Sequence, residues 1–261
     1  MSNLLLEEKK DKLSIKGYST SIEMGKAAAD FVSRHLQSAI AKKGSANLIL
    51  ATGASQFSFL DAFKSTTSFD WSKVTVFHLD EYVGIQSSHP ASFRRYLRER
   101  ILDEVHPHKI YFLDGDATNI GNVIEKYEQQ LKSHPIDVAC IGIGENGHIA
   151  FNDPAVADFN DPKMVKIVDL DEKSRRQQVN EGWFETLEEV PKQALSLTIP
   201  AIMRSETISC VVPDQRKAEA VSHAISGPVS TQCPASILRT HPDTVLFLDQ
   251  YSASGIIHGH L

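Results

Sequence analysis

Short runs of apolar, β-prone residues alternate along the chain with longer segments of helical periodicity. Several of the short runs, Val138–Ile143 above all, are apolar on both faces rather than at alternate positions. Strands of this kind are typical of a parallel sheet that helices cover on both sides. We predict strands at residues 47–51, 74–79, 110–113, 136–143, 165–170, 195–199, 208–212 and 245–248. The alternation therefore predicts an α/β fold with a mostly parallel sheet.

The first helix has the clearest boundaries. Thr20 and Glu23 have the spacing of a capping box, apolar residues follow at helical intervals, and Gly44 marks the end. Further helices are predicted at residues 57–65, 90–104, 119–133, 171–184 and 214–226. Residues 1–12 are charged and aperiodic, which predicts a loosely held N-terminal arm before a single domain at 13–261.

Charge and cysteine content narrow the class of partner. The 261 residues carry 33 acidic and 27 basic side chains, a net charge of -6, and the basic residues are scattered. This distribution argues against nucleic acid or an anionic membrane as a partner and favours a small molecule. Cys140, Cys210 and Cys233 lack metal spacing and two of them lie in apolar runs, which indicates reduced thiols in the cytoplasm. No apolar run approaches the roughly 20 residues of a membrane span, so we expect a soluble protein.

Ligands of open α/β sheets bind beyond the carboxyl ends of the strands. After the strand at 47–51 come Thr52, Gly53, Ala54 and Ser55, a small hydroxyl-bearing turn that can offer backbone N–H groups to an anion. An ordinary helix cap by Ser55 is an equally good interpretation.

Two carboxylates, Asp80 and Glu81, follow the strand at 74–79. Strand alternation allows only one of them to face a pocket, and Asp80 is nearer the strand end. A solvated acidic loop is the alternative interpretation.

The third junction is a glycine-rich turn that carries Asn146, His148 and Asp153. A histidine can exchange a proton near neutral pH, and a neighbouring carboxylate can orient it. The glycines of this turn also fit a dinucleotide fingerprint, but Pro154 breaks the chain where that motif requires a long helix. Among the other histidines, His78, His89 and the pair His258 and His260 add no recognised zinc spacing. We therefore expect neither a metal nor a nicotinamide cofactor.

Four motifs in order resemble the glucosamine-6-phosphate deaminase/isomerase family, over about residues 14–250. They are Leu79-Asp-Glu-Tyr-Val-Gly84 with His89-Pro-x-Ser92, Gly142-x-Gly-x-Asn-Gly-His-Ile-Ala-Phe-Asn-x-Pro154, Val190-Pro-x-x-Ala194-Leu and Gln215-x-Lys-Ala218. The resemblance implies a modified doubly wound, Rossmann-like sheet with helices on both faces. It also implies an enzyme that converts an amino-sugar phosphate and water into a ketose phosphate and ammonia, without a metal or nicotinamide.

The resemblance also implies roles for individual residues. Asp80 would be the base that moves a proton between C2 and C1 of the open-chain sugar, and His148 would assist ring opening, flanked by Asn146 and Asp153. Lys217 would bind phosphate together with the 52–55 turn. From spacing alone, Lys217 reads as a solvated cation on a charged helix.

The chain departs from the family pattern at several positions. Many members have aspartate at the position of Asn146 and glutamate at that of Asp153. Members often have an arginine in an Asn-Ser-Arg-Phe-Phe segment, where this chain has Gly182 within residues 180–184. Arg175 and Arg176, about two helical turns earlier, are candidates to replace it at the phosphate. The proline often found after the 52–55 turn is also absent.

The leading interpretation is an enzyme that converts glucosamine 6-phosphate and water into fructose 6-phosphate and ammonia. A galactosamine-6-phosphate deaminase and a 6-phosphogluconolactonase are alternatives within the same superfamily. A sugar-phosphate-binding regulator without turnover is an alternative of another class. Both a single chain and a homo-oligomer agree with the sequence.

Overall fold

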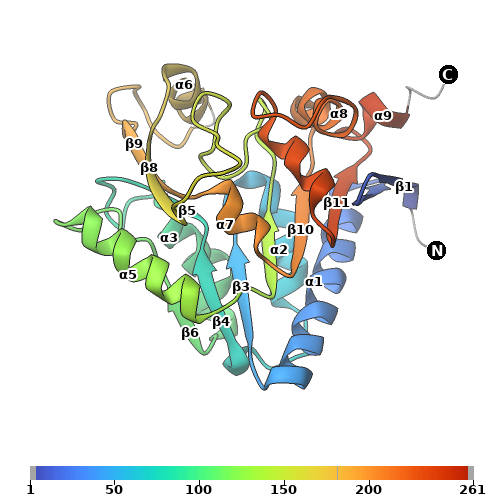
Figure 1. Ribbon diagram of the computed structural model, residues 1–261, viewed down its shortest axis with the longest axis horizontal. Coiled ribbons are helices and arrows are strands. Elements are labelled where there is room, and N and C mark those ends of the chain that lie inside the picture. The colour runs from blue at the N-terminus through green and yellow to red at the C-terminus, as the bar shows by residue number, and fades with distance from the viewer. Residues whose placement is uncertain (1–3, 181, 258–261) are drawn as a thin grey trace.

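The computed structural model describes residues 4–180 and 182–257. Eight strands form the main sheet, in the order β1-β2-β11-β10-β7-β3-β4-β6 (Figure 1). All neighbours are parallel except β1 and β2. The strands are β1 (Leu4–Lys10), β2 (Leu13–Tyr18), β3 (Ala46–Leu50), β4 (Val74–His78), β6 (Lys109–Tyr111), β7 (Val138–Ile141), β10 (Thr207–Val212) and β11 (Thr244–Asp249). The predicted mostly parallel α/β sheet is confirmed.

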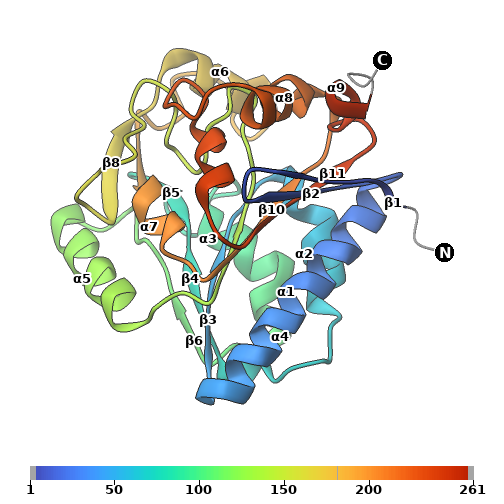
Figure 2. The ribbon, with the colours of Figure 1, turned by 45° about the vertical axis from the view of Figure 1, so that its right-hand side comes forward.

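Helices cover both faces of this sheet (Figures 1 and 2). One face packs against α1 (Ser21–Lys43), α2 (Phe57–Lys64) and α3 (Phe93–Leu97), and the other against α5 (Ile120–Ser133), α7 (Ile199–Met203) and α8 (Ala218–Ser226). In β3, Leu48 and Leu50 belong to the first core while Ile49 belongs to the second. This alternation explains why the central strands are apolar at every position.

Helix boundaries follow local signals closely. The Thr20 side chain accepts a hydrogen bond from the Glu23 N–H, and Gly44 ends α1 with a φ of 81°. The helix predicted at 90–104 starts later, at Phe93, because Ser92 is its N-cap, and it continues through a π-helical turn (Arg98–Leu102) into α4 (Asp103–Val105). The helix predicted at 171–184 is α6 (Glu172–Asn180); residue 181 lies outside the described residues.

A second, antiparallel sheet contains β5 (Asp80–Tyr82), β9 (Gln193–Leu197) and β8 (Val165–Asp169). The strands predicted at 165–170 and 195–199 therefore exist, but they do not join the main sheet. Their apolar residues divide between two cores: Val165, Leu195 and Leu197 belong to the main core, whereas Val168 and Ala194 belong to a smaller one together with Tyr82. An apolar run predicts burial and leaves the choice of sheet open.

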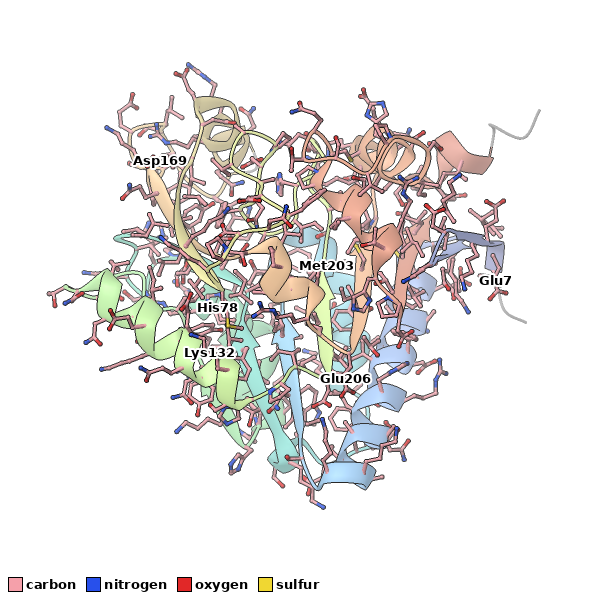
Figure 3. The ribbon with its side chains drawn as sticks, in the orientation of Figure 1. Glu7, His78, Lys132, Asp169, Met203 and Glu206 are labelled. Carbon is pink, nitrogen blue, oxygen red and sulfur yellow. The ribbon has the colours of Figure 1, made fainter. Side chains whose placement is uncertain are left out.

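The N-terminal segment differs from the predicted loose arm. Residues 4–10 form β1, which pairs along its length with β2. Leu6 packs against the main core while Leu5 is exposed, and Glu7 lies on the outer edge of the sheet (Figure 3). The charged residues of this segment are those of an edge strand, where charge protects against pairing with other chains. Residues 1–3 lie outside the described part of the chain.

The last element within the described residues is a short helix, α9 (Ser254–Ile257). Among the residues that the structure describes, no helix combines the length and apolar character that crossing a membrane requires.

Candidate functional site

A cleft of about 1170 Å³ opens at the carboxyl ends of β3, β4, β7 and β10. In Figure 1 these ends lie toward the upper half of the molecule, where the long connections gather. The lining of the cleft includes the predicted residues Thr52, Gly53, Ala54, Ser55, Asp80, His148 and Lys217. Side chains that are more than 160 residues apart in sequence thus meet because parallel strands end at one edge of the sheet.

Asp80 is the first residue of β5 and is only 7% exposed. No side chain or backbone group within the described residues hydrogen-bonds its Oδ1 atom. Burial, and then the negative charge of Glu81, raise the pKa of Asp80 to about 8. A carboxyl with a raised pKa is a strong base for its type, which suits the removal of a proton from carbon.

Glu81 points away from the cleft, as strand alternation requires, and is fully buried. Its carboxylate accepts hydrogen bonds from the Ser92 hydroxyl at 2.8 Å, the Phe93 N–H at 3.1 Å and the Tyr82 N–H at 3.0 Å. Arg94 adds its own N–H at 3.1 Å and its Nε at 3.2 Å. Burial raises the pKa of Glu81, and these donors oppose that shift. The carboxylate joins β5 to the N-terminus of α3.

The Arg94 guanidinium completes this network behind the cleft. It donates to Asp116 at 2.8 Å, to Asp114 at 3.3 Å and to the Ile85 carbonyl at 2.7 Å. Between the two aspartates, Gly115 packs so closely that an added Cβ would lie 2.0 Å from the Tyr82 carbonyl oxygen. Sequence reasoning missed this support of Asp80, since ion pairs between distant residues leave no periodic signal.

His148, Asn146 and Asp153 form the predicted cluster. The His148 Nδ1 atom lies 2.7 Å from Asn146 Oδ1 and 3.0 Å from Asp153 Oδ1, and Asn146 Nδ2 donates to Asp153 at 2.7 Å. Both neighbours of Nδ1 are acceptors, so in the neutral ring the proton lies on Nδ1 and the lone pair on Nε2. Burial alone would raise the pKa of Asp153, but the hydrogen bond and charge of His148, together with Asn146, lower it overall.

Glycines shape the turn that carries His148. The imidazole lies directly over Gly144, where an added Cβ would be 2.0 Å from His148 Cε1. Gly147 has a φ of 83°, and a Cβ there would lie 2.7 Å from Cys233 Sγ. The glycine spacing that resembles a dinucleotide motif therefore serves the placement of a histidine.

The 52–55 turn and Lys217 line the same cleft. Gly53 has a φ of 96°, and its carbonyl accepts a hydrogen bond from the Tyr96 hydroxyl at 2.8 Å. A short 3-10 turn, Ala54–Gln56, then leads into α2. Hydroxyls, backbone N–H groups and a lysine amine together suit an anionic ligand.

Lys217 ends a 3-10 turn, Gln215–Lys217, that precedes α8. Asp214 begins this turn with a φ of 87°, which is rare for a residue with a side chain, and its carboxylate accepts the Arg216 N–H at 2.9 Å. Buried Asp249 in turn accepts the Asp214 N–H at 3.2 Å. The loops after β10 and β11 thus hold Lys217 at the cleft.

Arg175 and Arg176 do not line the cleft, contrary to the expectation that one of them reaches a phosphate. The Arg175 guanidinium donates to the carbonyls of Leu187 and Val190, and Arg176 pairs with Glu172 on its own helix. Helical spacing gave their positions along α6 but not the side toward which they point. The arginine that does line the cleft is Arg216.

Within residues 4–180 and 182–257, no three histidine, cysteine or acidic side chains are placed to hold a metal ion. His258 and His260 lie outside this part of the chain. His78 on β4 lies inside the molecule (Figure 3), where burial and then the Arg94 charge lower its pKa to about 3. His78 is therefore neutral and separate from the cleft.

A family model and a curated relative of this chain both carry the name of a glucosamine-6-phosphate enzyme. Residues 19–247 match the model of the family glucosamine-6-phosphate isomerases/6-phosphogluconolactonase. The chain is 37% identical over 212 residues to the glucosamine-6-phosphate deaminase of Streptococcus pyogenes serotype M18, covering 81% of this chain and 88% of that protein.

Among solved structures, a monomeric glucosamine-6-phosphate deaminase superposes with a TM-score of 0.83 at 29% identity, covering 92% of this chain and 99% of that one. A 6-phosphogluconolactonase from Shewanella baltica OS155 superposes with a TM-score of 0.74 at 18% identity, covering 93% and 98%. The second similarity concerns the fold alone.

Proposed function

The chain belongs to the family of glucosamine-6-phosphate isomerases and 6-phosphogluconolactonases, and we propose that it converts glucosamine 6-phosphate and water into fructose 6-phosphate and ammonia. The observation that carries this proposal is the carboxyl of Asp80, which is buried at the cleft with a raised pKa. Moving a proton between two carbons of a sugar requires such a base, whereas hydrolysis of a lactone does not.

Ring opening is the first step of this reaction. The Nε2 lone pair of His148 takes the proton of the anomeric hydroxyl and delivers it to the ring oxygen as the C1–O5 bond breaks. Asn146 and Asp153 hold the imidazole and stabilise its charged form while it carries the proton.

Isomerisation follows in the open-chain sugar. Asp80 removes the proton from C2 while the C2 ammonium gives a proton to the oxygen on C1, which yields an enolamine. Asp80 then returns its proton to C1. The resulting C2 iminium adds water and releases ammonia, and C2 becomes the ketone of fructose 6-phosphate. One water is consumed for each ammonia that is released.

The phosphate end of the substrate would lie between the 52–55 turn and Lys217. The N–H groups of the turn and the hydroxyls of Thr52 and Ser55 donate to the phosphate oxygens, and the Lys217 amine supplies a positive charge. Arg216 lies beside Lys217 and pairs with Asp214 at 3.0 Å. We assign the phosphate charge to the lysine because Lys217 is the residue that the family motif marks.

The test is release of ammonia together with formation of fructose 6-phosphate from glucosamine 6-phosphate. Galactosamine 6-phosphate and 6-phosphogluconolactone are assayed in parallel, with Asp80→Asn as the inactive control. Turnover of glucosamine 6-phosphate in preference to both supports the proposal. Hydrolysis of the lactone alone would show that the protein is a 6-phosphogluconolactonase. Binding of glucosamine 6-phosphate without turnover of any substrate would show that it is a sugar-phosphate-binding regulator.

The cytoplasm remains our proposed location. Cys140 and Cys210 are free and buried in the core, and Cys233 is free and half-buried. Three unpaired thiols suit a reducing compartment.

A further inference from the structure

Gln56 stands at the end of the 52–55 turn, where the family often has a proline, and its side chain is 1% exposed. Its Nε2 atom donates to the Val211 carbonyl at 3.3 Å and lies 3.2 Å from Ser55 Oγ. A carbonyl can only accept, which fixes the orientation of the amide with Nε2 toward Val211.

The hydrogen bond from Gln56 to Val211 crosses a whole strand. Gln56 follows β3 and Val211 belongs to β10, and β7 lies between these two strands in the sheet. The amide passes over Gly142 at the end of β7, where an added Cβ would lie 3.1 Å from Gln56 Nε2 and 3.4 Å from the Val211 oxygen. Only glycine leaves this passage open without a shift of the amide.

This bridge connects the two halves of the phosphate site of the proposed function. On one side is the 52–55 turn, and on the other is the chain that runs from Val211 through Asp214 to Lys217. We propose that Gln56 is a positioning residue that sets the spacing between the 52–55 turn and Lys217, and with it the affinity for the substrate phosphate. The inference rests on the proposed function in placing the phosphate here.

Gln56 also determines how Ser55 binds an anion. Its Nε2 has two hydrogens, one for the Val211 carbonyl and one for a lone pair of Ser55 Oγ. The Ser55 hydroxyl proton is then free to point into the cleft. A phosphate dianion has only acceptor oxygens, so a hydroxyl that is held as a donor binds it better than one free to rotate. A proline in place of Gln56 has no donor for this task.

The segment from Val211 to Lys217, at the other end of the Gln56 hydrogen bond, is also fixed by hydrogen bonds. Asp249 accepts hydrogen bonds from the N–H groups of Asp214, Tyr251 and Ser252 at 3.2, 3.1 and 2.8 Å. Movement of β10 relative to β3 would therefore carry the Lys217 turn with it. Loss of the Gln56 hydrogen bond would free the 52–55 turn only. A substitution of Gln56 should therefore change phosphate binding without disordering Lys217.

The experiment compares Gln56→Met, which keeps the side-chain length and removes both donors, with the wild-type protein. Binding of glucosamine 6-phosphate and of inorganic phosphate is measured by calorimetry, and KM and kcat are measured on glucosamine 6-phosphate. We expect both dissociation constants and KM to rise about tenfold, the order of one lost charge-assisted hydrogen bond, while kcat stays within about twofold. Unchanged dissociation constants, or a loss confined to kcat, would overturn the inference.

Two further variants make the result specific. Gly142→Ala pushes the amide aside without altering Gln56 and should weaken phosphate binding in the same direction, which also covers the case that Gln56→Met does not fold. Gln193→Met is the matched control, because exposed Gln193 donates to Asp169 at 2.8 Å outside the cleft; its phosphate affinity should equal that of the wild type. Phosphate affinity does not depend on turnover, so failure of this inference and failure of the deaminase assay are distinguishable.

Discussion

Asp80 and Glu81 are neighbours in the chain, and strand alternation sends their carboxyls to opposite faces of β5. Asp80 faces the cleft with one oxygen unpaired, while Glu81 accepts hydrogen bonds from Tyr82, Ser92 and the following turn of α3. The same burial thus has different effects. It gives Asp80 a pKa of about 8, whereas the donors around Glu81 oppose the rise there.

The raised pKa of Asp80 predicts a cost in stability. Its folded-state pKa of about 8 exceeds the ordinary value of 3.8, so the folded protein binds an extra proton between these values and loses stability as the pH rises through this window. Asp80→Asn has no charge to bury. We expect the variant to be more stable than the wild type by roughly a few kcal/mol at pH 8, and the difference to shrink toward pH 4.

Thermal unfolding of both proteins across this pH range measures the effect. A difference in stability that is independent of pH would mean that Asp80 ionises normally in the folded protein.

We expect substitution of Gly144 by alanine to lower activity with little change in fold. Gly144→Ala places a Cβ within 2.0 to 2.3 Å of three ring atoms of His148, so the imidazole must move away from Asn146 and Asp153. A displacement of about 1 Å at a catalytic group can cost about 100-fold in rate. We expect a fall in kcat of that order.

Gly121→Ala is the control for this substitution, because the nearest atom to its added Cβ is Asn119 Oδ1 at 3.4 Å, on the first turn of α5. Activity of Gly121→Ala should match the wild type. A Gly144→Ala enzyme with full activity would contradict the placement of His148.

At the scale of the elements, β5 is held from two sides. Its backbone pairs with β9, and Glu81 and Arg94 join it to the N-terminus of α3. Asp114 and Asp116 bind Arg94 from the loop after β6. The strand that carries Asp80 is therefore rigid, as a catalytic base on a short strand requires.

Removal of Arg94 should be far more costly than removal of an exposed arginine. Arg94→Met leaves the buried Glu81 carboxylate without its counter-charge, a change that typically costs about 3–5 kcal/mol. Arg176→Met breaks only the exposed pair with Glu172 on α6, for which about 0.3–0.5 kcal/mol is usual. Chemical denaturation of both variants measures the free energy of unfolding. Similar decreases in the two variants would show that the Glu81 network stabilises the fold no more than a surface ion pair does.

The elements show how far sequence patterns extend. Periodicity and caps predicted α1 and the parallel strands, because those signals lie within one segment. The second sheet was not foreseen, since Val165–Asp169 and Gln193–Leu197 look like any other buried run. Neither run shows that the two pair with each other, and that the second pairs with β5, instead of joining the main sheet.

The site residues also divide into those that a local pattern marks and those that depend on contacts between distant segments. Asp80, His148 and Lys217 were found because strand ends and motifs mark them, and the structure brings them to one cleft. Arg175 and Arg176 do not line this cleft, because helical spacing does not give the direction of a side chain. Gln56, Arg94 and Asp249 act through contacts with distant segments, which no local pattern reveals.

At the scale of the molecule, strand order explains the position of the cleft. From β3 the chain proceeds outward to β4 and β6, and then returns to the other side of β3 with β7, β10 and β11. The connections after β3 and β7 therefore diverge, which leaves a crevice at the topological switch point. The 52–55 turn and the His148 turn lie on either side of it.

The reactivity of the three cysteine thiols measures whether the core of the molecule is packed as described. Burial raises the pKa of the Cys140 and Cys210 thiols, which lie in the core of the sheet, and also that of half-buried Cys233. We expect a thiol reagent at pH 8 to modify at most one cysteine of the native protein, slowly, and all three in denaturant. Rapid modification of two or more thiols in the native protein would contradict the packing of the β7 and β10 core.

The most direct test of the proposed function is the turnover of glucosamine 6-phosphate by Asp80→Asn, with substrate affinity measured on the same preparation. An amide has the size of the carboxyl and cannot accept the proton from C2. The proposed mechanism predicts that kcat falls by at least about 1,000-fold while the dissociation constant changes by less than about threefold. A variant that keeps more than a tenth of the wild-type kcat would contradict the role of Asp80 as the base.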